Sequence, residues 1–143
     1  MRFLCILPFF IGISLSVYAQ NGILKSETET QAISKKVSEL FSKNKISDAF
    51  NEINPYWPLP ENELIAIEDK TIKYLNVIED RFGRSIGFVK VKNETISDFA
   101  IRETYLVRYE NTAIRLIFTY YKNNEGWIVN AFKWDDSYDE EFK

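Results

Sequence analysis

The sequence contains no histidine and only one cysteine, Cys5, among its 143 residues. The lack of histidine excludes the Ser-His and Cys-His pairs that activate nucleophiles in many hydrolases. Together with the single cysteine, it also removes the nitrogen and sulfur ligands of ordinary zinc sites. The chemistry left to the chain is that of carboxylates, hydroxyls, amines and guanidinium groups. We therefore expect no metal and no cofactor.

Long apolar runs are also missing, except at the N-terminus. Arg2 precedes a mostly apolar stretch over residues 3–18, and Val17-Tyr18-Ala19 has the small-x-small pattern of a signal-peptide cleavage site. The stretch is shorter than the roughly 20 residues that a spanning helix needs. It predicts a secretory signal peptide over residues 1–19, cleaved after Ala19, and a mature protein without a membrane span.

Cys5 lies within this predicted signal peptide, so processing would remove the one thiol. A domain without disulfides is held together by its core, which favours a periplasmic or secreted bacterial protein over a disulfide-stabilised animal module. Cleavage would leave 124 of the 143 residues, which is enough for one hydrophobic core. The sequence thus predicts a single domain over residues 20–143.

Acidic residues outnumber basic ones, 21 to 18. This balance weighs against binding to the phosphates of a nucleic acid. Five acids crowd the last nine residues: Asp135, Asp136, Asp139, Glu140 and Glu141. Such a group could collect calcium, but its spacing and its lack of glycine do not match an EF-hand loop. The composition favours a frayed acidic tail over residues 135–143.

The first half of the chain has helical periodicity. Apolar residues recur at three-to-four-residue spacing over residues 27–43, at Ala32, Ile33, Val37, Leu40 and Phe41. A short second helix follows, with Ser47 as its predicted N-cap and Pro55 at its end. The three prolines of residues 55–60 predict a non-helical connector that packs over the core and is not a recognition peptide.

The third predicted helix runs from Glu61 to residue 82, with acids in its first turn and Gly83 after its end. The following Gly83-Arg84-Ser85-Ile86-Gly87 matches neither a dinucleotide nor a phosphate-loop fingerprint, so we interpret it as a helix stop and strand entry. From here β-branched and aromatic residues dominate, and they predict strands over residues 86–92, 99–109, 112–121 and 127–134. Helices followed by antiparallel strands predict an α+β fold with the helices on one face of a curved sheet.

The turn at Glu110-Asn111 suggests a register for the middle hairpin. A two-residue loop would pair Val107 with Ile114, Tyr105 with Leu116, Glu103 with Phe118 and Ile101 with Tyr120. These residues would share one apolar face, and the opposite face would carry Arg102, Thr104, Leu106, Arg108, Arg115 and Thr119. A slip of one residue would exchange the two sets.

Glu103 is the main candidate for chemistry, because an apolar sheet face disfavours the ionised form of a carboxylate and suits it to acid/base work. The alternative is that Glu103 pairs with an arginine, bonds a tyrosine hydroxyl or lies at an exposed edge. The other pocket candidates on its face are Tyr105, Tyr109, Tyr120 and Phe118, which can equally be core rings. Arg102, Arg108 and Arg115 could bind an anion, but a solvated surface is the simpler interpretation.

The second half of the chain also resembles a known family. The runs over residues 105–109, 113–122 and 126–136, with Phe142, form a tyrosine-rich strand pair and a Gly-Trp strand. In this pattern, residues 30–143 resemble small exported bacterial proteins of the nuclear transport factor 2-like (cystatin-like) superfamily. The resemblance implies a cone-shaped sheet around the helices. In that superfamily the space between them is an enzyme site, a binding site or filled by side chains, so the resemblance alone selects no function.

Two hypotheses follow. The first is an exported non-catalytic module that binds an envelope protein or a small apolar ligand. The second is a small-cavity enzyme that transfers protons with Glu103 and tyrosines, which requires a deep pocket at that carboxylate. Leu106, Ile117 and Tyr121 on the outer face would also allow a homodimer through the sheet.

Overall fold

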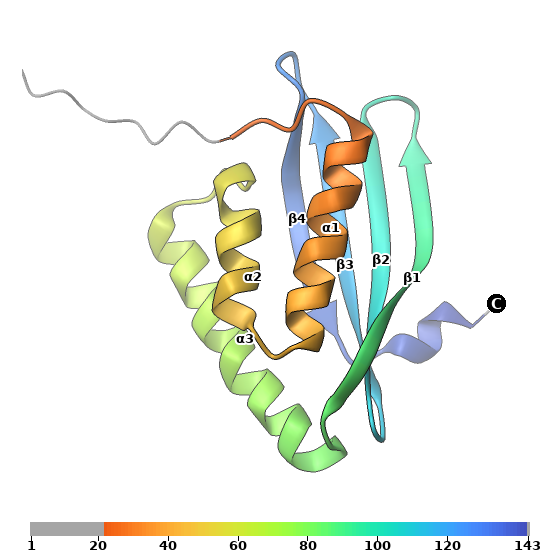
Figure 1. The fold of residues 1–143 in the computed structure, drawn as a ribbon. Helices are drawn as coiled ribbons and strands as arrows, with labels where there is room; N and C mark the ends of the chain where they lie inside the picture. The colour runs from red at the N-terminus through yellow and green to blue at the C-terminus, as the bar shows by residue number, and fades with distance from the viewer. Residues whose placement is uncertain (1–21, 143) are drawn as a thin grey trace, which may run out of the picture.

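The computed structural model describes residues 22–142, in which three α-helices pack against a four-stranded antiparallel sheet (Figure 1). The helices are α1 (Glu27–Ser42), α2 (Ile46–Ile53) and α3 (Glu61–Phe82), and the 3₁₀ turn η1 (Asn54–Tyr56) follows α2. The strands are β1 (Ser85–Ile96), β2 (Ala100–Tyr109), β3 (Ala113–Lys122) and β4 (Trp127–Asp135), followed by the 3₁₀ turn η2 (Tyr138–Glu141). The predicted α+β class is confirmed. The predicted signal peptide lies outside the described residues.

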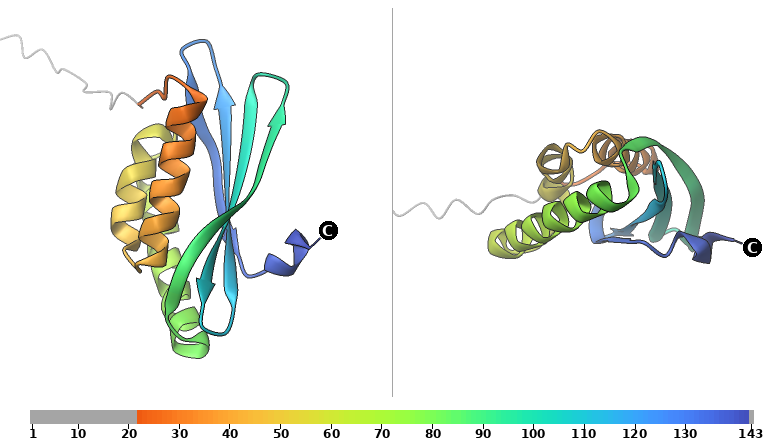
Figure 2. Two further views of the ribbon diagram at one scale, coloured as in Figure 1. Left: turned by 45° about the vertical axis from the view of Figure 1, so that its right-hand side comes forward. Right: turned by 90° about the horizontal axis from the view of Figure 1, so that it is seen from below.

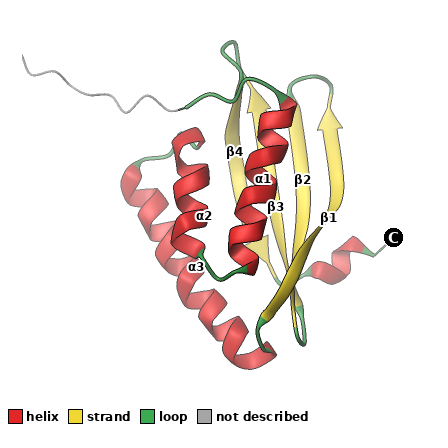
Figure 3. Cartoon of the chain, viewed as in Figure 1, coloured by secondary structure: helices red, strands yellow, loops and turns green. Residues whose placement is uncertain are grey.

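None of the helices within residues 22–142 has the length and apolar character that crossing a membrane requires. The four strands form a simple meander in the order β1-β2-β3-β4 (Figure 3). Each strand therefore pairs with its neighbour in sequence. All three helices lie on one side of this sheet, and η2 lies on the other (Figure 2). We call these the inner and outer faces.

Local capping sets the ends of α1. The Ser26 side chain accepts a hydrogen bond from the Glu29 N–H at the start. At the end, Asn44 adopts a left-handed conformation (φ 55°), and the Lys45 N–H bonds back to the Leu40 carbonyl at 2.9 Å, as in a Schellman motif. The predicted N-cap of the second helix is wrong, because α2 begins at Ile46, one residue before Ser47, with no side-chain cap.

The buried face of α1 differs from the predicted apolar stripe. Val37, Leu40 and Phe41 are buried as expected, but Ala32 is exposed. The rest of the buried face consists of small hydroxyl residues one turn apart: Thr30, Ser34 and Ser38. Small side chains allow a helix to lie close to a sheet, and their hydroxyls need partners once buried.

The connector after α2 is partly helical. The prediction that no helix occurs here is wrong for Asn54–Tyr56, because proline is tolerated in the first turn of a helix, where its missing N–H is not needed. The predicted packing over the core is confirmed by Trp57, which is buried with its ring 6.2 Å from that of Phe132. The connector thus covers the core beside β4.

Aromatic rings fill the space between the helices and the inner face. Phe118 of β3 stacks on Phe132 of β4 at 4.8 Å, and Phe41 of α1 meets Phe132 edge-on at 5.6 Å. The Trp134 indole N–H also donates to the Thr71 hydroxyl of α3 at 2.8 Å. Packed rings of this kind contribute burial and leave little room for a ligand.

The register of the β2–β3 hairpin is the predicted one, including the pair Glu103–Phe118. The first strand extends beyond its predicted end to Ile96, and its pairing with β2 shifts between Lys90 and Lys92. A bulge of this kind places two residues of one strand opposite a single residue of the neighbouring strand. As a result Lys90 pairs with Tyr105 of the inner face, whereas Lys92 pairs with Thr104 of the outer face.

The prediction of a frayed acidic tail is wrong for residues 135–142. Asp135 is the last residue of β4, and Tyr138–Glu141 form η2. Side chains of Asp135, Glu140 and Glu141 bind the guanidinium group of Arg115 on the outer face. A buried cation thus gives these acids a structural position that composition alone does not reveal.

Candidate functional sites on the two faces of the sheet

Glu103 lies on the inner face of β2 and is fully buried. Its Oε2 accepts a hydrogen bond from the Ser34 hydroxyl of α1 at 2.7 Å, and its Oε1 lies 2.5 Å from the Lys90 Nζ of β1. The carboxylate thus joins a helix to the edge strand. An ionised group at this depth is tolerated because it has both a cation and a hydroxyl as partners.

The hydrogen bonds continue from Ser34 to Tyr120 of β3, with the two hydroxyl oxygens 2.7 Å apart. A serine hydroxyl has one hydrogen, which Ser34 gives to Glu103, so Tyr120 donates to Ser34. Burial raises the pKa of the Tyr120 phenol; the Ser34 bond opposes this shift and the Glu103 charge adds to it. Tyr120 therefore remains a protonated donor. We call Ser34, Lys90, Glu103 and Tyr120 the Glu103 network.

Two of the other predicted site residues surround this network. The Lys90 Nζ lies 5.8 Å from the centre of the Tyr105 ring, a distance at which the cation is attracted to the ring. The Tyr105 ring in turn meets Phe118 edge-on at 5.9 Å. Burial, with the nearby Glu103 charge, raises the pKa of Tyr105 to about 12. These contacts make Tyr105 and Phe118 core rings beside the network.

Only Lys90 connects the Glu103 network to solvent, since its side chain is one-third exposed (33%) and that of Glu103 is 0% exposed. The arrangement could pass a proton between carboxylate and hydroxyls, but general acid/base catalysis also needs a substrate within reach. None of the hollows described on residues 22–142 has Glu103 in its lining. The carboxylate is not in bulk solvent either, so its surroundings are those of a buried structural ion pair.

Tyr109 is not part of this group. Tyr109 lies at the end of β2, about 20 Å along the strand from Glu103. It lines a hollow on the protein surface together with Glu79 and Ser85. Burial, with the Glu79 charge, raises the pKa of Tyr109 to about 12. The structure therefore brings together four of the five predicted pocket residues and separates the fifth.

The outer face is organised around Arg115 of β3. Its Nη2 lies 2.7 Å from Asp135 Oδ2 and 2.9 Å from Glu140 Oε2, and its Nη1 lies 2.9 Å from Glu141 Oε1. The predicted solvated surface is wrong for Arg115, which is 9% exposed because η2 covers it. We call Arg115, Asp135, Glu140 and Glu141 the Arg115 cluster. Three of the five acids considered for calcium, Asp135, Glu140 and Glu141, therefore already bind a cation.

The ion pairs of the Arg115 cluster shift its titration. Burial alone would raise the pKa of Asp135, but hydrogen bonds from Arg115 and from the Ser137 N–H hold it below its ordinary value. The Lys92 ammonium group, 2.5 Å from Glu141 Oε2, lowers the pKa of Glu141, burial opposes this shift, and Arg115 adds to it. Asp135 and Glu141 thus stay ionised to lower pH than free carboxylates.

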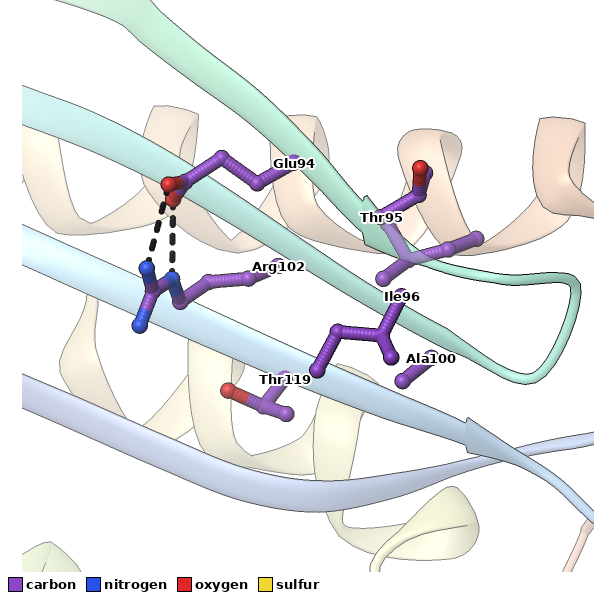
Figure 4. Close-up of a pocket in the computed structure, with 7 residues that line it drawn as sticks. Glu94, Thr95, Ile96, Ala100, Arg102 and Thr119 are labelled. Atoms are coloured by element: carbon purple, nitrogen blue, oxygen red, sulfur yellow. Dashed lines mark hydrogen bonds and ion pairs between the residues drawn. The ribbon is translucent and has the colours of Figure 1, made fainter.

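A hollow of about 240 Å³ lies on the outer face near the β1–β2 hairpin (Figure 4). Ile96, Ala100 and Thr119 line it, and the ion pair between Arg102 Nε and Glu94 Oε2, at 2.8 Å, closes one side. Three large apolar side chains are exposed beside it: Ile96 (64%), which lines it, Tyr121 (44%), which pairs with the lining residue Ala100, and Phe99 (41%), which precedes Ala100 in the chain. The Phe99 and Tyr121 rings are 6.0 Å apart. We call Ile96, Phe99 and Tyr121 the apolar rim.

Two members of the Glu103 network, Ser34 and Lys90, were not predicted as site residues. A signal for Ser34 exists in the spacing of Thr30, Ser34 and Ser38, since hydroxyls at i, i+4 and i+8 share one helix face. Lys90 had no such signal, because the bulge after it reverses the alternation of the strand.

Comparison of the chain with protein-family models, with curated proteins and with solved structures finds no match. The function of the chain is therefore inferred from the geometry of the two faces of its sheet.

Proposed function

We propose that this chain is an exported, non-catalytic module that binds a protein partner through the apolar rim and the adjoining hollow. The observation that carries the proposal is the exposure of Ile96, Phe99 and Tyr121 around one hollow. Apolar side chains gathered on a surface are typical of binding sites, whereas single ones are ordinary.

The size of the hollow favours a protein over a small apolar ligand. Pockets for drug-sized apolar ligands commonly occupy roughly 300–1,000 Å³ and enclose most of the ligand. A hollow of about 240 Å³ on a sheet face fits one apolar anchor side chain of a partner. The Arg102–Glu94 ion pair at its side would supply polar contacts at the edge of such an interface.

The inner face supports the non-catalytic part of the proposal. Phe41, Phe118 and Phe132 occupy the space in which a cone-shaped domain would hold a substrate, and Glu103 already has its partners. We also propose membership in the nuclear transport factor 2-like superfamily and export by the N-terminal signal. The order of helices followed by four antiparallel strands supports the first, and the residue pattern of residues 1–19 supports the second.

Site-specific photocrosslinking tests the binding surface. A benzophenone amino acid is placed at Phe99 in the exported full-length protein, and the matched control has it at Ile65, which is 52% exposed on α3. We expect a discrete crosslinked protein from position 99 and none from position 65. Tyr121→Ser should abolish the product at position 99 without changing the melting temperature.

Several outcomes would overturn the proposal or identify the occupant of the hollow. Equal products at both positions, or none from position 99, would remove the apolar rim as an interface. A small molecule retained in native mass spectrometry and lost on Ile96→Ser would favour the ligand alternative. A product of twice the chain mass would identify the partner as a second copy, and hence a homodimer through the outer face.

A further inference from the structure

A second hollow, of about 180 Å³, lies where the ends of α1 and α3 meet the start of β1 and the end of β2. Its lining includes five side chains with polar or charged groups, those of Asn44, Glu79, Arg84, Ser85 and Tyr109. It is remote from the apolar rim, which lies at the opposite end of β2. Its chemistry is therefore independent of the proposed protein interface.

This hollow is lined by two opposite charges that are not paired with each other. Glu79 accepts a hydrogen bond from the Asn44 amide at 2.9 Å, but no ion pair within 4.0 Å is formed by Glu79 or Arg84 among residues 22–142. Lys43 also lines the hollow, but its Nζ is 2.6 Å from Glu39 Oε1. The charges left available are one carboxylate and one guanidinium.

Two hydroxyl groups add to these charges. The Ser85 Oγ is buried and has no hydrogen-bond partner in the described part of the chain. A buried hydroxyl without a partner is costly, and its presence points to a group that is bound there at other times. Tyr109, which also lines the hollow, supplies a second hydroxyl, and this phenol is protonated at neutral pH.

The backbone holds this arrangement in place. Asn44 has the left-handed conformation that ends α1, and its amide fixes the Glu79 carboxylate from α3. Arg84 lies between the end of α3 and the start of β1, and Ser85, the first residue of β1, pairs with Tyr109 of β2. The charged groups thus come from separate elements that are fixed relative to one another.

We propose that this hollow binds a small zwitterion of the α-amino acid class, with its carboxylate on Arg84 and Ser85 and its ammonium group on Glu79. A guanidinium group binds a carboxylate through two parallel hydrogen bonds. The Glu79 carboxylate would repel an anion that carries no positive charge. It would attract the ammonium group that lies next to the carboxylate in an α-amino acid. The volume of about 180 Å³ limits the ligand to a short side chain.

The test is a titration of the isotope-labelled full chain with L-alanine, followed by the backbone amide signals in NMR spectra. We expect saturable shifts in the millimolar range, centred on Asn44, Ser85 and Tyr109. Acetate and methylammonium, which each carry one of the two charges, should bind at least about tenfold more weakly than L-alanine. Shifts that do not saturate, or acetate binding as tightly as L-alanine, would overturn the proposal.

Matched variants identify the residues involved. Arg84→Gln and Glu79→Gln should each weaken L-alanine binding at least about tenfold. Arg108→Gln is the control, because Arg108 is also exposed and without an ion pair among the described residues, but lies on the outer face. If Arg84→Gln binds as tightly as Arg108→Gln while both keep the wild-type spectrum elsewhere, the zwitterion site is wrong.

Discussion

On the inner face of the sheet one carboxylate meets one ammonium group, whereas on the outer face three carboxylates meet one guanidinium group. Glu103 is 0% exposed, and its only route to water is through Lys90. In the Arg115 cluster the side chains of Arg115 and Glu141 are 11% and 10% exposed, but those of Asp135 and Glu140 are 36% and 61% exposed. The same kind of interaction therefore occurs under two different degrees of desolvation.

This difference determines what each face can tolerate. A buried charge that loses its partner keeps its full desolvation penalty, so the Glu103 network is fixed by the cost of breaking it. Exposed charges that lose a partner return to water, and their pairing contributes little. The inner face is therefore suited to holding α1, β1 and β3 together, whereas the solvent-exposed pairs of the outer face can change their contacts at lower cost.

The largest effect should come from Lys90→Met, which keeps most of the side-chain volume but removes the ammonium group. Glu103 would then be a buried charge without a cation. We expect a loss of about 3–5 kcal/mol in the free energy of unfolding, measured by urea denaturation at pH 7.

Lys92→Met is the matched control, because Lys92 lies on the same strand and pairs with Glu141 on the outer face. The loss should be smaller, about 1–2 kcal/mol, because Glu141, although its side chain is only 10% exposed, keeps its ion pair with Arg115. The double variant Lys90→Met with Glu103→Leu should recover most of the stability lost in Lys90→Met, since it removes both charges. Equal losses in the two lysine variants would contradict the contrast between the faces.

The alternation of apolar and polar residues was enough to predict this contrast in part. The two-residue turn and the period-two pattern predicted the register of β2 with β3, and hence the burial of Glu103. Predicting its partners required two further facts. One is the bulge between Lys90 and Lys92, and the other is the depth at which α1 lies on the sheet.

Neither fact is visible in one-dimensional periodicity. A bulge leaves the strand composition unchanged while it reverses which side chains face inward. The spacing of Thr30, Ser34 and Ser38 places their hydroxyls on one helix face, but serine is mostly exposed in proteins, so the spacing alone does not show that this face is buried. The acidic residues 135–141 were misinterpreted for a related reason, since their cation, Arg115, is 20 residues away from Asp135.

Ser34→Ala should give the next largest effect, because it removes a donor from Glu103 and an acceptor from Tyr120. We expect a loss of about 1–3 kcal/mol in the free energy of unfolding. Ser38→Ala is the control: Ser38 is equally buried one turn later, but its hydroxyl bonds only to the Ser34 carbonyl of its own helix. That variant should remain within about 0.5 kcal/mol of wild type. Equal losses would show that helix packing, and not the network, explains the effect.

Arg115→Gln should have a smaller effect that depends on pH. The folded-state pKa values of Asp135 and Glu141 are lowered, so both acids stabilise the fold above their unfolded values of about 4. That stability is lost as the pH falls through the folded-state values. We expect Arg115→Gln to cost about 1–2 kcal/mol at pH 7, because the cluster is part-exposed. The difference from wild type should shrink at pH 3; a difference independent of pH would contradict this origin.

The smallest effect should be the coupling between Arg102 and Glu94, whose side chains are 55% and 40% exposed on the outer face. A double-mutant cycle with Arg102→Gln and Glu94→Gln should give about 0.2–1 kcal/mol, measured by urea denaturation. In 1 M salt, where charges are screened beyond about 3 Å, most of this coupling should vanish. The corresponding cycle with Lys90→Met and Glu103→Gln should give a larger coupling that changes little with salt, because Glu103 is closed to ions. The Arg102–Glu94 coupling energy could instead equal the Lys90–Glu103 coupling energy, or salt could weaken both equally. Either result would show that the two faces do not differ in how strongly their ion pairs are desolvated.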